Sequence, residues 1–249
     1  MLPPLFYAPP QNRTGDIIEL SAAEGRHAQS VLRLSKGTPV IVVDGIGTAF
    51  RGELTGGPRS KKVTVGIHSE TRHYGEPSIH LTLAVGLSVG SKFDEIIDKG
   101  TQLGVRRFVP LVTNKTKMRF DDPKRLASRL KRWEKVALAA LKQCRRSYLP
   151  NISTPTSVVD FLPQVEPGSL SLIFHPDPSV SSFDNLSINS DYQRAYLLVG
   201  PESGFSDDEY QFAIRAGFTP TRLGTRILRT ETAGPAVCAL VMNAVGELR

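Results

Sequence analysis

The sequence predicts an α/β protein built from a small β-rich N-terminal domain and a larger domain with a mostly parallel sheet. Up to about residue 69, short strand-like apolar runs follow one another with a single helical pattern between them. From Ile79 onward, strand and helix patterns alternate, which favours a parallel sheet covered by helices on both faces. The polar, Gly- and Pro-containing stretch Thr71–Ser78 separates the two patterns. We therefore expect domains at residues 1–72 and 73–249.

Composition places the chain among ordinary globular proteins. Its 249 residues are enough for a core without disulfides, and 40% are hydrophobic and 22% charged. No apolar run approaches the roughly 20 residues of a membrane span, and the N-terminus lacks the pattern of a secretory signal. The two cysteines, Cys144 and Cys238, have no CxxC partners, so we expect reduced thiols, no metal site and a cytoplasmic location.

Positive charge is concentrated in one stretch of the chain. The net charge is +7, and between Lys115 and Arg146 twelve basic residues face only three acidic ones. Such runs are commonly the solvated face of a helix. Here the surplus of this stretch exceeds that of the whole chain, which favours a surface that contacts the phosphates of a nucleic acid.

The N-terminal domain is predicted to be a small barrel of five strands and one helix. Asp44-Gly45 is a hairpin signal, and Ser21 with Glu24 predicts a capping box ahead of the helix. The pattern then continues at roughly helical spacing with His27, Val31, Leu32 and Leu34. The expected strands are Phe6-Tyr7, Ile17–Leu20, Pro39–Val43, Thr48–Leu54 and Lys62–Ile67.

The second domain begins with a strand–helix–strand unit and continues with a long amphipathic helix. Asp122 is the expected N-cap of that helix, with Pro123 at its first position. Its apolar face carries Leu126, Leu130, Trp133, Ala137, Ala140 and Leu141, and its other face carries the basic residues. The further elements expected are strands at Ile79–Val85, Arg107–Val112, Leu170–Phe174 and Tyr196–Val199 and a helix at Ser91–Leu103.

Two glycine-containing turns near the C-terminus are the strongest functional signal. The strand Tyr196–Val199 stops at Gly200-Pro201, and Ser206 predicts the N-cap of a helix that ends near Gly217. A second turn runs from Leu223 to Ala233, with Thr230 as the expected cap of the final helix. Because ligands of open α/β sheets bind at the carboxyl ends of the strands, these turns predict a ligand site.

A different class of enzyme is suggested by Gly86-Leu87-Ser88-Val89-Gly90, which satisfies the GxSxG pattern of a nucleophile elbow. A serine hydrolase then needs an acid and a histidine later in the chain, and only Asp160 with His175 supplies that order. Several strands precede the elbow in α/β-hydrolases, whereas here the preceding residues predict a separate barrel. The hydrolase is therefore the weaker hypothesis.

The two turns closely resemble those of a known family. VGPESGFSDDE followed by LGTRILRTETA resembles the signature of the RsmE family, the 16S rRNA uridine-N3 methyltransferases of the SPOUT class. HAQSVLRLSKGTPVIVVDGIG resembles the family's N-terminal PUA-like domain, a small RNA-binding barrel, and SKFDEIIDKGTQLGVRRFVPLVT resembles its first helix and second strand. The resemblance implies a C-terminal trefoil knot, S-adenosylmethionine as cofactor, a homodimer, and the 16S rRNA of the small ribosomal subunit as substrate.

The resemblance also implies which residues form the site. Arg229 and Arg146 are the expected guanidinium groups beside the uracil oxygens, and Glu231 or Glu202 is the expected proton acceptor. The expected cofactor contacts are Phe174, His175, Leu198, Gly200, Pro201, Glu202, Gly204, Leu223, Gly224, Ile227, Leu228, Thr230 and Ala233.

Three positions depart from the family pattern. Ser203 stands where the family has glycine, Lys142 replaces an acidic residue, and Arg145 replaces a small one. Two alternatives therefore stay open: a non-catalytic RNA-binding relative, and a SPOUT methyltransferase that acts on another RNA such as tRNA.

Overall fold

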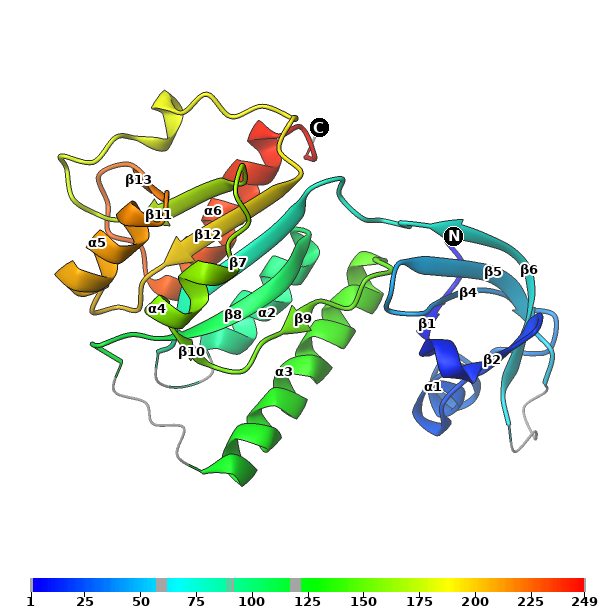
Figure 1. The fold of residues 1–249 in the computed structure, drawn as a ribbon. Coiled ribbons are helices and arrows are strands. Elements are labelled where there is room, and N and C mark those ends of the chain that lie inside the picture. The colour runs from blue at the N-terminus through cyan, green and yellow to red at the C-terminus, as the bar shows by residue number, and fades with distance from the viewer. Residues whose placement is uncertain (1, 57–61, 89, 91, 117–121, 249) are drawn as a thin grey trace. The chain divides into compact units, whose positions relative to one another are not determined.

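The computed structural model describes residues 2–56, 62–88, 90, 92–116 and 122–248, so the basic residues Lys117 and Arg119 lie outside the described residues. The chain divides into two compact units (Figure 1). Unit 1 contains Met1–Glu76 and Leu141–Leu149, and unit 2 contains Pro77–Ala140 and Pro150–Arg249. No helix among the described residues is both long enough and apolar enough to cross a membrane.

Unit 1 is a six-stranded sheet curled around its own core, in the order β1-β4-β5-β6-β3-β2. Neighbouring strands are antiparallel except for β1 and β4, which are parallel. The core is formed by inward residues such as Phe6, Ile18, Val42 and Leu54, each no more than 2% exposed. The elements are β1 (Leu5–Tyr7), a 3-10 turn η1 (Pro10–Asn12), β2 (Arg13–Thr14), β3 (Ile17–Glu19), α1 (Ala22–Arg26), the π-helical turn η2 (His27–Val31), β4 (Pro39–Val43), β5 (Thr48–Leu54) and β6 (Thr64–Arg72).

The helix of this unit differs from its prediction in two ways. The Ser21 hydroxyl accepts from Glu24 N at 3.2 Å, but the Glu24 carboxylate accepts from Lys142 Nζ at 2.6 Å, so only half of the predicted capping box is described. After Arg26 the backbone continues as a π-helical turn, which shifts the helical register. Val31 and Leu32, which belong to the predicted helical pattern, are 66% and 40% exposed.

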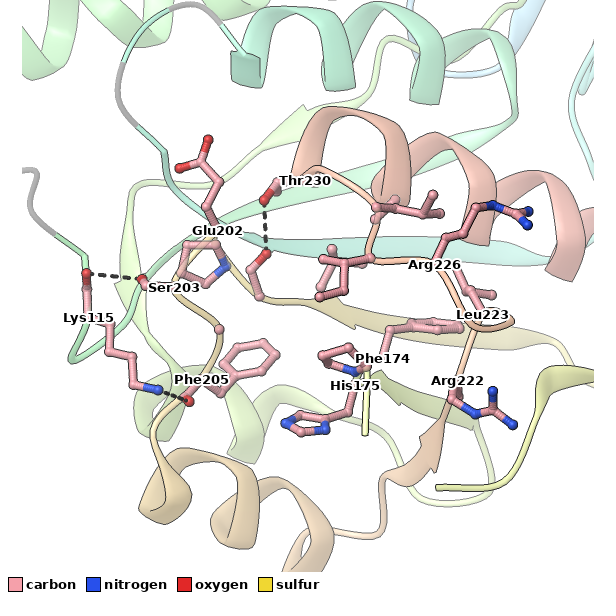
Figure 2. Close-up of a pocket in the computed structure, with 18 of the residues that line it drawn as sticks. Lys115, Phe174, His175, Glu202, Ser203, Phe205, Arg222, Leu223, Arg226 and Thr230 are labelled. Atoms are coloured by element: carbon pink, nitrogen blue, oxygen red, sulfur yellow. Dashed lines mark hydrogen bonds between the residues drawn. The ribbon is translucent and has the colours of Figure 1, made fainter. Parts of the chain in front are cut away.

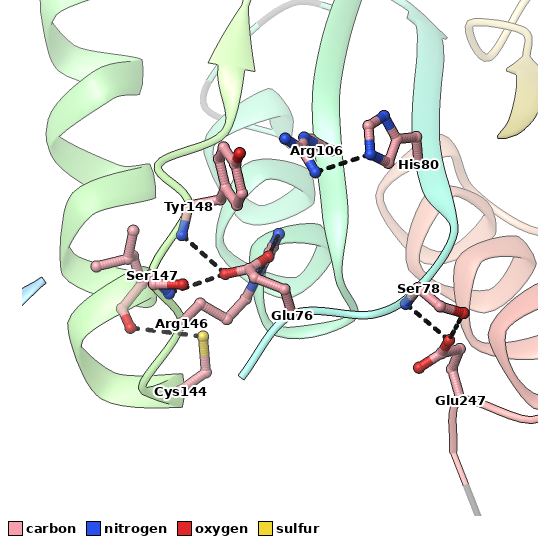
Figure 3. Close-up of polar contacts among 10 residues, drawn as sticks. Glu76, Ser78, His80, Arg106, Cys144, Arg146, Ser147, Tyr148 and Glu247 are labelled. Atoms are coloured by element: carbon pink, nitrogen blue, oxygen red, sulfur yellow. Dashed lines mark hydrogen bonds and ion pairs between the residues drawn. The ribbon is translucent and has the colours of Figure 1, made fainter. Parts of the chain in front are cut away.

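A buried ion pair holds residues 141–149 against the rest of unit 1. Nε and Nη2 of Arg146 donate to one oxygen of Glu76 at 3.1 and 2.7 Å, and the other oxygen accepts from the backbone N–H groups of Ser147 and Tyr148 (Figure 3). The two charged side chains are 3% and 2% exposed. We call these four residues the Glu76 cluster.

Unit 2 is built on a seven-stranded sheet in which every described pairing is parallel. The order is β10-β8-β7-β12-β11-β13, and β9 also pairs with β8. Its elements are β7 (His80–Gly86), α2 (Lys92–Gln102), β8 (Val105–Val112), α3 (Pro123–Cys144), β9 (Asn151–Ile152), β10 (Thr156–Ser157), α4 (Val158–Phe161), η3 (Leu162–Gln164), β11 (Leu170–Phe174), η4 (Phe183–Asn185), β12 (Arg194–Val199), α5 (Asp207–Arg215), β13 (Thr219–Thr221) and α6 (Thr230–Ala244).

Helices cover both faces of this sheet, as predicted. One face meets α4 and α5, where Phe161 and Ala213 pack on Ile173 and Leu198 of the central strands (Figure 1). On the other face α2 and α6 pack on each other, α6 against β7 and α2 against β8. Because β7 and β12 are central and buried on both faces, their sequences are nearly continuous apolar runs.

The long helix α3 begins where the sequence predicts. Asp122 Oδ1 accepts from the N–H groups of Lys124 and Arg125 at 2.9 and 3.2 Å, as expected of an N-cap. Cys144 ends α3 and Cys238 lies inside α6; both are free, and burial raises the pKa of each thiol. The low thiolate fraction that follows makes both cysteines poor nucleophiles.

Candidate functional site

Residues 200–206, which follow β12, form the first of two loops at the carboxyl edge of the sheet. Gly204 has φ +70°, a conformation that glycine adopts without strain, and its N–H donates to Pro201 O at 2.8 Å. Ser203 is not among the residues with positive φ, and its hydroxyl donates to Lys115 O at 3.3 Å. The serine in place of the family glycine is therefore accommodated without backbone strain.

Three further contacts position this first loop. Lys115 Nζ donates to Phe205 O at 2.8 Å, and Ser206 forms a complete capping box with Glu209 at the start of α5. Gly86, the last residue of β7, lies so close that a Cβ built on it falls 2.2 Å from Pro201 Cδ. A glycine at position 86 is thus required by the approach of the loop.

The second loop, residues 222–229, leads from β13 into α6. The Arg222 side chain holds it: Nη1 donates to Gly224 O at 3.0 Å and Nε to Val180 O at 3.3 Å. The predicted capping role of Thr230 is wrong, because α6 begins at Thr230 itself and the hydroxyl donates instead to Gly200 O at 3.2 Å. This hydrogen bond ties the two loops together.

The two loops line one pocket with a cavity volume of about 320 Å³ (Figure 2). Its walls combine apolar side chains such as Phe174, Val199 and Leu228 with glycine backbone, and no atom lies within 4 Å of a Cβ built on Gly204 or Gly224. The lining residues are Lys115, Phe174, His175, Pro176, Val199, Gly200, Pro201, Glu202, Ser203, Gly204, Phe205, Arg222, Leu223, Gly224, Arg226, Ile227, Leu228, Thr230 and Ala233.

Every predicted cofactor contact except Leu198 lies in this lining. Leu198 is fully buried in the core between the sheet and α4–α5, and its strand pairs with a neighbour on each side. His175 reaches the pocket from the end of β11, and its ring lies 4.9 Å from that of Tyr210. Burial, followed by the charge of Asp177, raises the pKa of the Tyr210 hydroxyl, which stays protonated and neutral beside the pocket.

The three predicted catalytic residues occupy different surroundings. Arg229 is exposed at the N-cap position of α6, one residue before Thr230 of the pocket lining. Glu231 lies in the first turn of the same helix with a side chain 16% exposed, and its Oε2 has no hydrogen-bond partner among the described residues. Arg146 belongs to unit 1, where its guanidinium is engaged by Glu76. Its catalytic role stays a prediction, and the contacts described are those of a structural residue.

A lysine that the sequence analysis missed lies between the two candidate proton acceptors. Lys92, at the start of α2, forms an ion pair with Glu202, and its Nζ is 3.8 Å from Glu231 Oε2. We call these three residues the Lys92 cluster. Lys115, Arg222 and Arg226 also line the pocket and were not predicted. The basic run that begins at Lys115 was the only sequence signal for any of these residues. The sequence did not show that they meet at the pocket, because the contacts that bring them there join residues far apart in the chain.

The GxSxG residues do not form a hydrolase triad in the described residues. The Ser88 hydroxyl has no hydrogen-bond partner there, whereas a nucleophilic serine needs a histidine within reach. His175 Nδ1 accepts from Asp177 N at 3.2 Å, and the Asp160 carboxylate accepts from Ser157 at 2.6 Å. Nor do the described residues contain a group of three His, Cys, Asp or Glu side chains able to hold a metal ion.

Two family profiles match the chain, one in each predicted domain. The RNA methyltransferase domain matches residues 75–242, and the RNA methyltransferase PUA domain matches residues 20–67. The ribosomal RNA small subunit methyltransferase E of Synechocystis sp. is 33% identical over 234 residues, which cover 92% of this chain and 74% of that protein. The protein of the same name from Bacillus subtilis is 28% identical and covers 86% and 85%.

Solved structures agree over nearly the whole length. A ribosomal RNA small subunit methyltransferase E from Neisseria gonorrhoeae, bound to S-adenosylmethionine, has a TM-score of 0.87 at 27% identity and covers all of both chains. A Legionella pneumophila protein, described as a methyltransferase in complex with the same cofactor, has a TM-score of 0.85 at 28% identity and covers 98% and 99%. With the two loops, the pocket and both domain matches in agreement, this chain belongs to the ribosomal RNA small subunit methyltransferase E family.

Proposed function

We propose that this protein transfers the methyl group of S-adenosylmethionine to N3 of a uridine in the 16S rRNA of the small ribosomal subunit, in the cytoplasm. The observation that carries the proposal is the single pocket enclosed by two glycine loops at the carboxyl edge of a parallel sheet. Membership of the family supports both the cofactor and the small-subunit rRNA substrate.

The pocket fits S-adenosylmethionine in its chemistry. Apolar walls such as Phe174 and Leu228 suit an adenine ring, and the backbone N–H and C=O groups around Gly200, Gly204 and Gly224 suit the ribose and the amino-acid portion. When bound there, the cofactor supplies an electrophilic methyl group on a cationic sulfur. A Cβ built on Gly204 or Gly224 meets no other residue within 4 Å, so these two lining positions leave open space next to their backbone groups.

The protein's own residues must handle the imide proton and the charge that develops on the uracil oxygens. Glu231 is the proposed proton acceptor, because its Oε2 accepts no hydrogen bond from the described residues and lies 3.8 Å from Lys92 Nζ, whereas Glu202 is in direct contact with Lys92. Arg229, exposed beside the pocket, is the proposed guanidinium group, and one such fixed charge is worth roughly 3–4 kcal/mol in the transition state.

The remaining parts of the chain would hold the RNA and complete the site. Residues 1–72 are proposed as the PUA-like RNA-binding domain and residues 73–249 as the methyltransferase domain, with the C-terminal segment forming a trefoil knot. A homodimer is proposed from the family, and Ile227, which lines the pocket yet is 84% exposed, supports a partner surface there.

Nucleoside analysis of small-subunit rRNA tests the assignment. Deleting the gene should abolish N3-methyluridine in 16S rRNA, and the wild-type gene should restore it. Persistence of N3-methyluridine in the deletion strain would overturn the substrate. Calorimetry with S-adenosylmethionine separates the non-catalytic alternative, since a protein that binds no cofactor cannot carry out the reaction.

Substitution of Arg229 tests the proposed chemistry. Arg229→Ala should lower kcat by about 10²–10³-fold, the cost of one lost transition-state charge, with an unchanged melting temperature. The matched control is Arg215→Ala in α5, whose guanidinium lies 4.8 Å over the Phe212 ring and outside the pocket lining. Equal activity of the two variants would remove Arg229 from the mechanism.

A further inference from the structure

A cavity of about 200 Å³ lies within unit 1, in the part of the chain proposed to bind RNA. It is lined by strands β2, β3, β5 and β6 and by the segments that follow β1 and β4. A water molecule occupies about 30 Å³, and pockets for drug-sized ligands measure roughly 300–1,000 Å³. The volume therefore suits one flat ring system. We call this cavity the Asp44 pocket.

One wall of the Asp44 pocket is an arginine side chain fixed on an aromatic ring. The Arg13 guanidinium lies 4.7 Å from the centroid of the Phe50 ring. Its Nε donates to Gly15 O at 3.0 Å and its Nη1 to Glu70 Oε2 at 3.1 Å, so three contacts hold its plane, while the side chain stays 38% exposed. Proteins stack unpaired bases on such guanidinium planes and on aromatic rings. Further apolar lining comes from Ala8, Pro9, Pro10 and Ile18.

The carboxylate of Asp44 is a buried hydrogen-bond acceptor of the pocket. Asp44 is 6% exposed, and its Oδ1 accepts from the backbone N–H groups of Ile46 and Thr48, both at 2.9 Å. Its Oδ2 accepts no hydrogen bond from the described residues. Burying a charged oxygen is costly unless a donor compensates it. A ligand that brings N–H groups into the pocket would supply that donor.

The side chain of Arg72 is the matching donor, and the strand register places it on the same face. Glu70 and Arg72 are two residues apart on β6, so both side chains point to one face of the sheet. They pair with Phe50 and Thr48 of β5, which line the same pocket. No hydrogen bond or ion pair joins the Arg72 side chain to another described residue.

The charges of the pocket favour a neutral ligand with both donors and acceptors. Arg13 is paired with Glu70, which leaves one carboxylate and one guanidinium, so the lining attracts neither a phosphate nor a cation by net charge. Guanine fits such a pair, because its N1–H and amino groups donate while O6 and N7 accept. An arginine that donates to O6 and N7 is the commonest specific contact between a protein and this base.

We propose that the Asp44 pocket binds an unpaired guanine base of the substrate RNA. This inference rests on the proposed function. Asp44 Oδ2 accepts from the N–H groups of the base, Arg72 donates to O6 and N7, and the ring stacks on Arg13. Adenine is disfavoured, because it presents an acceptor at N1 to the carboxylate and an amino group in place of O6 to the guanidinium. A guanine read in this way would set the register of the RNA on unit 1.

Binding of two short single-stranded RNA oligonucleotides to the full-length protein tests the pocket. Both are uridine oligonucleotides with a fluorescent label, one with a single central guanosine and the other with a single central adenosine. Fluorescence anisotropy should show about tenfold tighter binding of the guanosine oligonucleotide by the wild-type protein, the scale of one hydrogen bond to a charged group. Equal affinities would overturn the guanine assignment.

Asp44→Asn is the sharpest substitution. Its amide oxygen can keep the two hydrogen bonds of Oδ1, and its NH₂ group replaces the accepting Oδ2. The preference for guanosine should therefore be lost at an unchanged melting temperature. Arg72→Ala changes an exposed residue and should lower the affinity for the guanosine oligonucleotide about tenfold, toward that for adenosine. A wild-type preference in either variant would overturn the pocket, so the test does not depend on the folding of Asp44→Asn.

The matched control is Arg51→Ala, which removes one positive charge from an exposed residue of β5 that does not line the pocket. It should weaken binding of both oligonucleotides equally and leave the preference intact, because a phosphate contact is independent of sequence. Loss of the guanosine preference in Arg51→Ala would overturn the Asp44 pocket as its source.

Calorimetry with two small ligands separates the remaining outcomes. Guanosine monophosphate should bind more weakly than the guanosine oligonucleotide, and equally tight binding would assign the pocket to a free nucleotide and overturn the RNA assignment. S-adenosylmethionine should bind alike to the wild-type protein and all three variants, because no described residue lines both pockets. Cofactor binding without a guanosine preference would overturn the Asp44 pocket alone. Absence of cofactor binding in the wild-type protein would overturn the proposed function, whatever the RNA affinities.

Discussion

The Glu76 cluster of unit 1 and the Lys92 cluster of unit 2 contain the same kinds of charge in opposite surroundings. The Glu76 side chain is 2% exposed, and each of its carboxylate oxygens accepts two hydrogen bonds. Two come from the Arg146 guanidinium and two from backbone N–H groups (Figure 3). Lys92 is 31% exposed and stands between two carboxylates, and Glu231 Oε2 has no hydrogen-bond partner among the described residues.

This difference separates a structural role from a chemical one. A carboxylate whose lone pairs are all engaged stabilises the fold and has nothing left to offer a substrate, whereas one with an open oxygen beside a pocket can accept a proton. Charge type alone does not reveal the difference. Arg146 and Arg229 were predicted for the same task from the sequence, yet only Arg229 is exposed next to the pocket.

The largest effect is expected from Glu76→Gln. The new amide would place an NH₂ group or a neutral oxygen against the Arg146 guanidinium and remove the carboxylate that balances this buried charge. Removing one partner of a buried pair costs about 3–5 kcal/mol of the free energy of unfolding, to be measured by urea denaturation followed by circular dichroism. Glu70→Gln is the control in the same unit, because Glu70 pairs with Arg13 at 3.1 Å in an exposed position and should cost less than about 1 kcal/mol. Similar losses in both would abolish the contrast between the clusters.

An intermediate effect is expected from Gly86→Ala, which displaces the loop that carries Glu202 of the Lys92 cluster. The added Cβ would lie 2.2 Å from Pro201 Cδ and 2.4 Å from Pro201 N, and a backbone atom cannot move away cheaply. Overpacking of this kind costs about 1–3 kcal/mol, and the shifted loop should also weaken cofactor binding in calorimetry. Gly234→Ala in α6 is the control: its nearest neighbour is Ile96 Cγ2 at 3.4 Å, and replacing a helical glycine should stabilise by about 0.5–1 kcal/mol. Wild-type cofactor affinity in Gly86→Ala would show that the loop position is not critical.

The parts of the fold that sequence reasoning predicted are those encoded by local patterns. Short strand-like patterns located β4, β5 and β11 at their observed bounds, and the N-caps Asp122 and Ser206 located the starts of α3 and α5. Elements of two to four residues, β9, β10, β13 and α4, are too short to show a period and were missed. The π-helical turn of η2 was missed because no single-residue signal marks the change of register.

The candidate site likewise contains residues that local patterns predicted and residues that they missed. Because the glycine loops are a local feature of the sequence, all but one of the predicted cofactor contacts line the pocket. Lys92 and Lys115 were missed, because Lys92 contacts a residue 110 positions away and Lys115 one 90 positions away. Thr230 shows that a tertiary contact can override a local sequence signal. Its place at a helix start suggested a cap, but a tertiary hydrogen bond to Gly200 O took its hydroxyl.

The smallest effect on stability, and the sharpest test of the contrast, is expected from Lys92→Gln. Because Lys92 and Glu202 are 31% and 47% exposed, solvent screens their attraction and the free energy of unfolding should fall by less than about 1 kcal/mol. Turnover should nevertheless fall about tenfold or more, since Glu202 and Glu231 lose the cation that holds them in place beside the pocket. Lys99→Gln on the same helix is the control: Lys99 pairs with Glu95 at 3.6 Å on the exposed face, so its loss should change stability equally and turnover not at all. The opposite outcome is that Lys92→Gln destabilises the protein as strongly as Glu76→Gln, with a proportionate loss of activity. The Lys92 cluster would then be structural, and a carboxylate oxygen without a hydrogen-bond partner would not identify the proton acceptor.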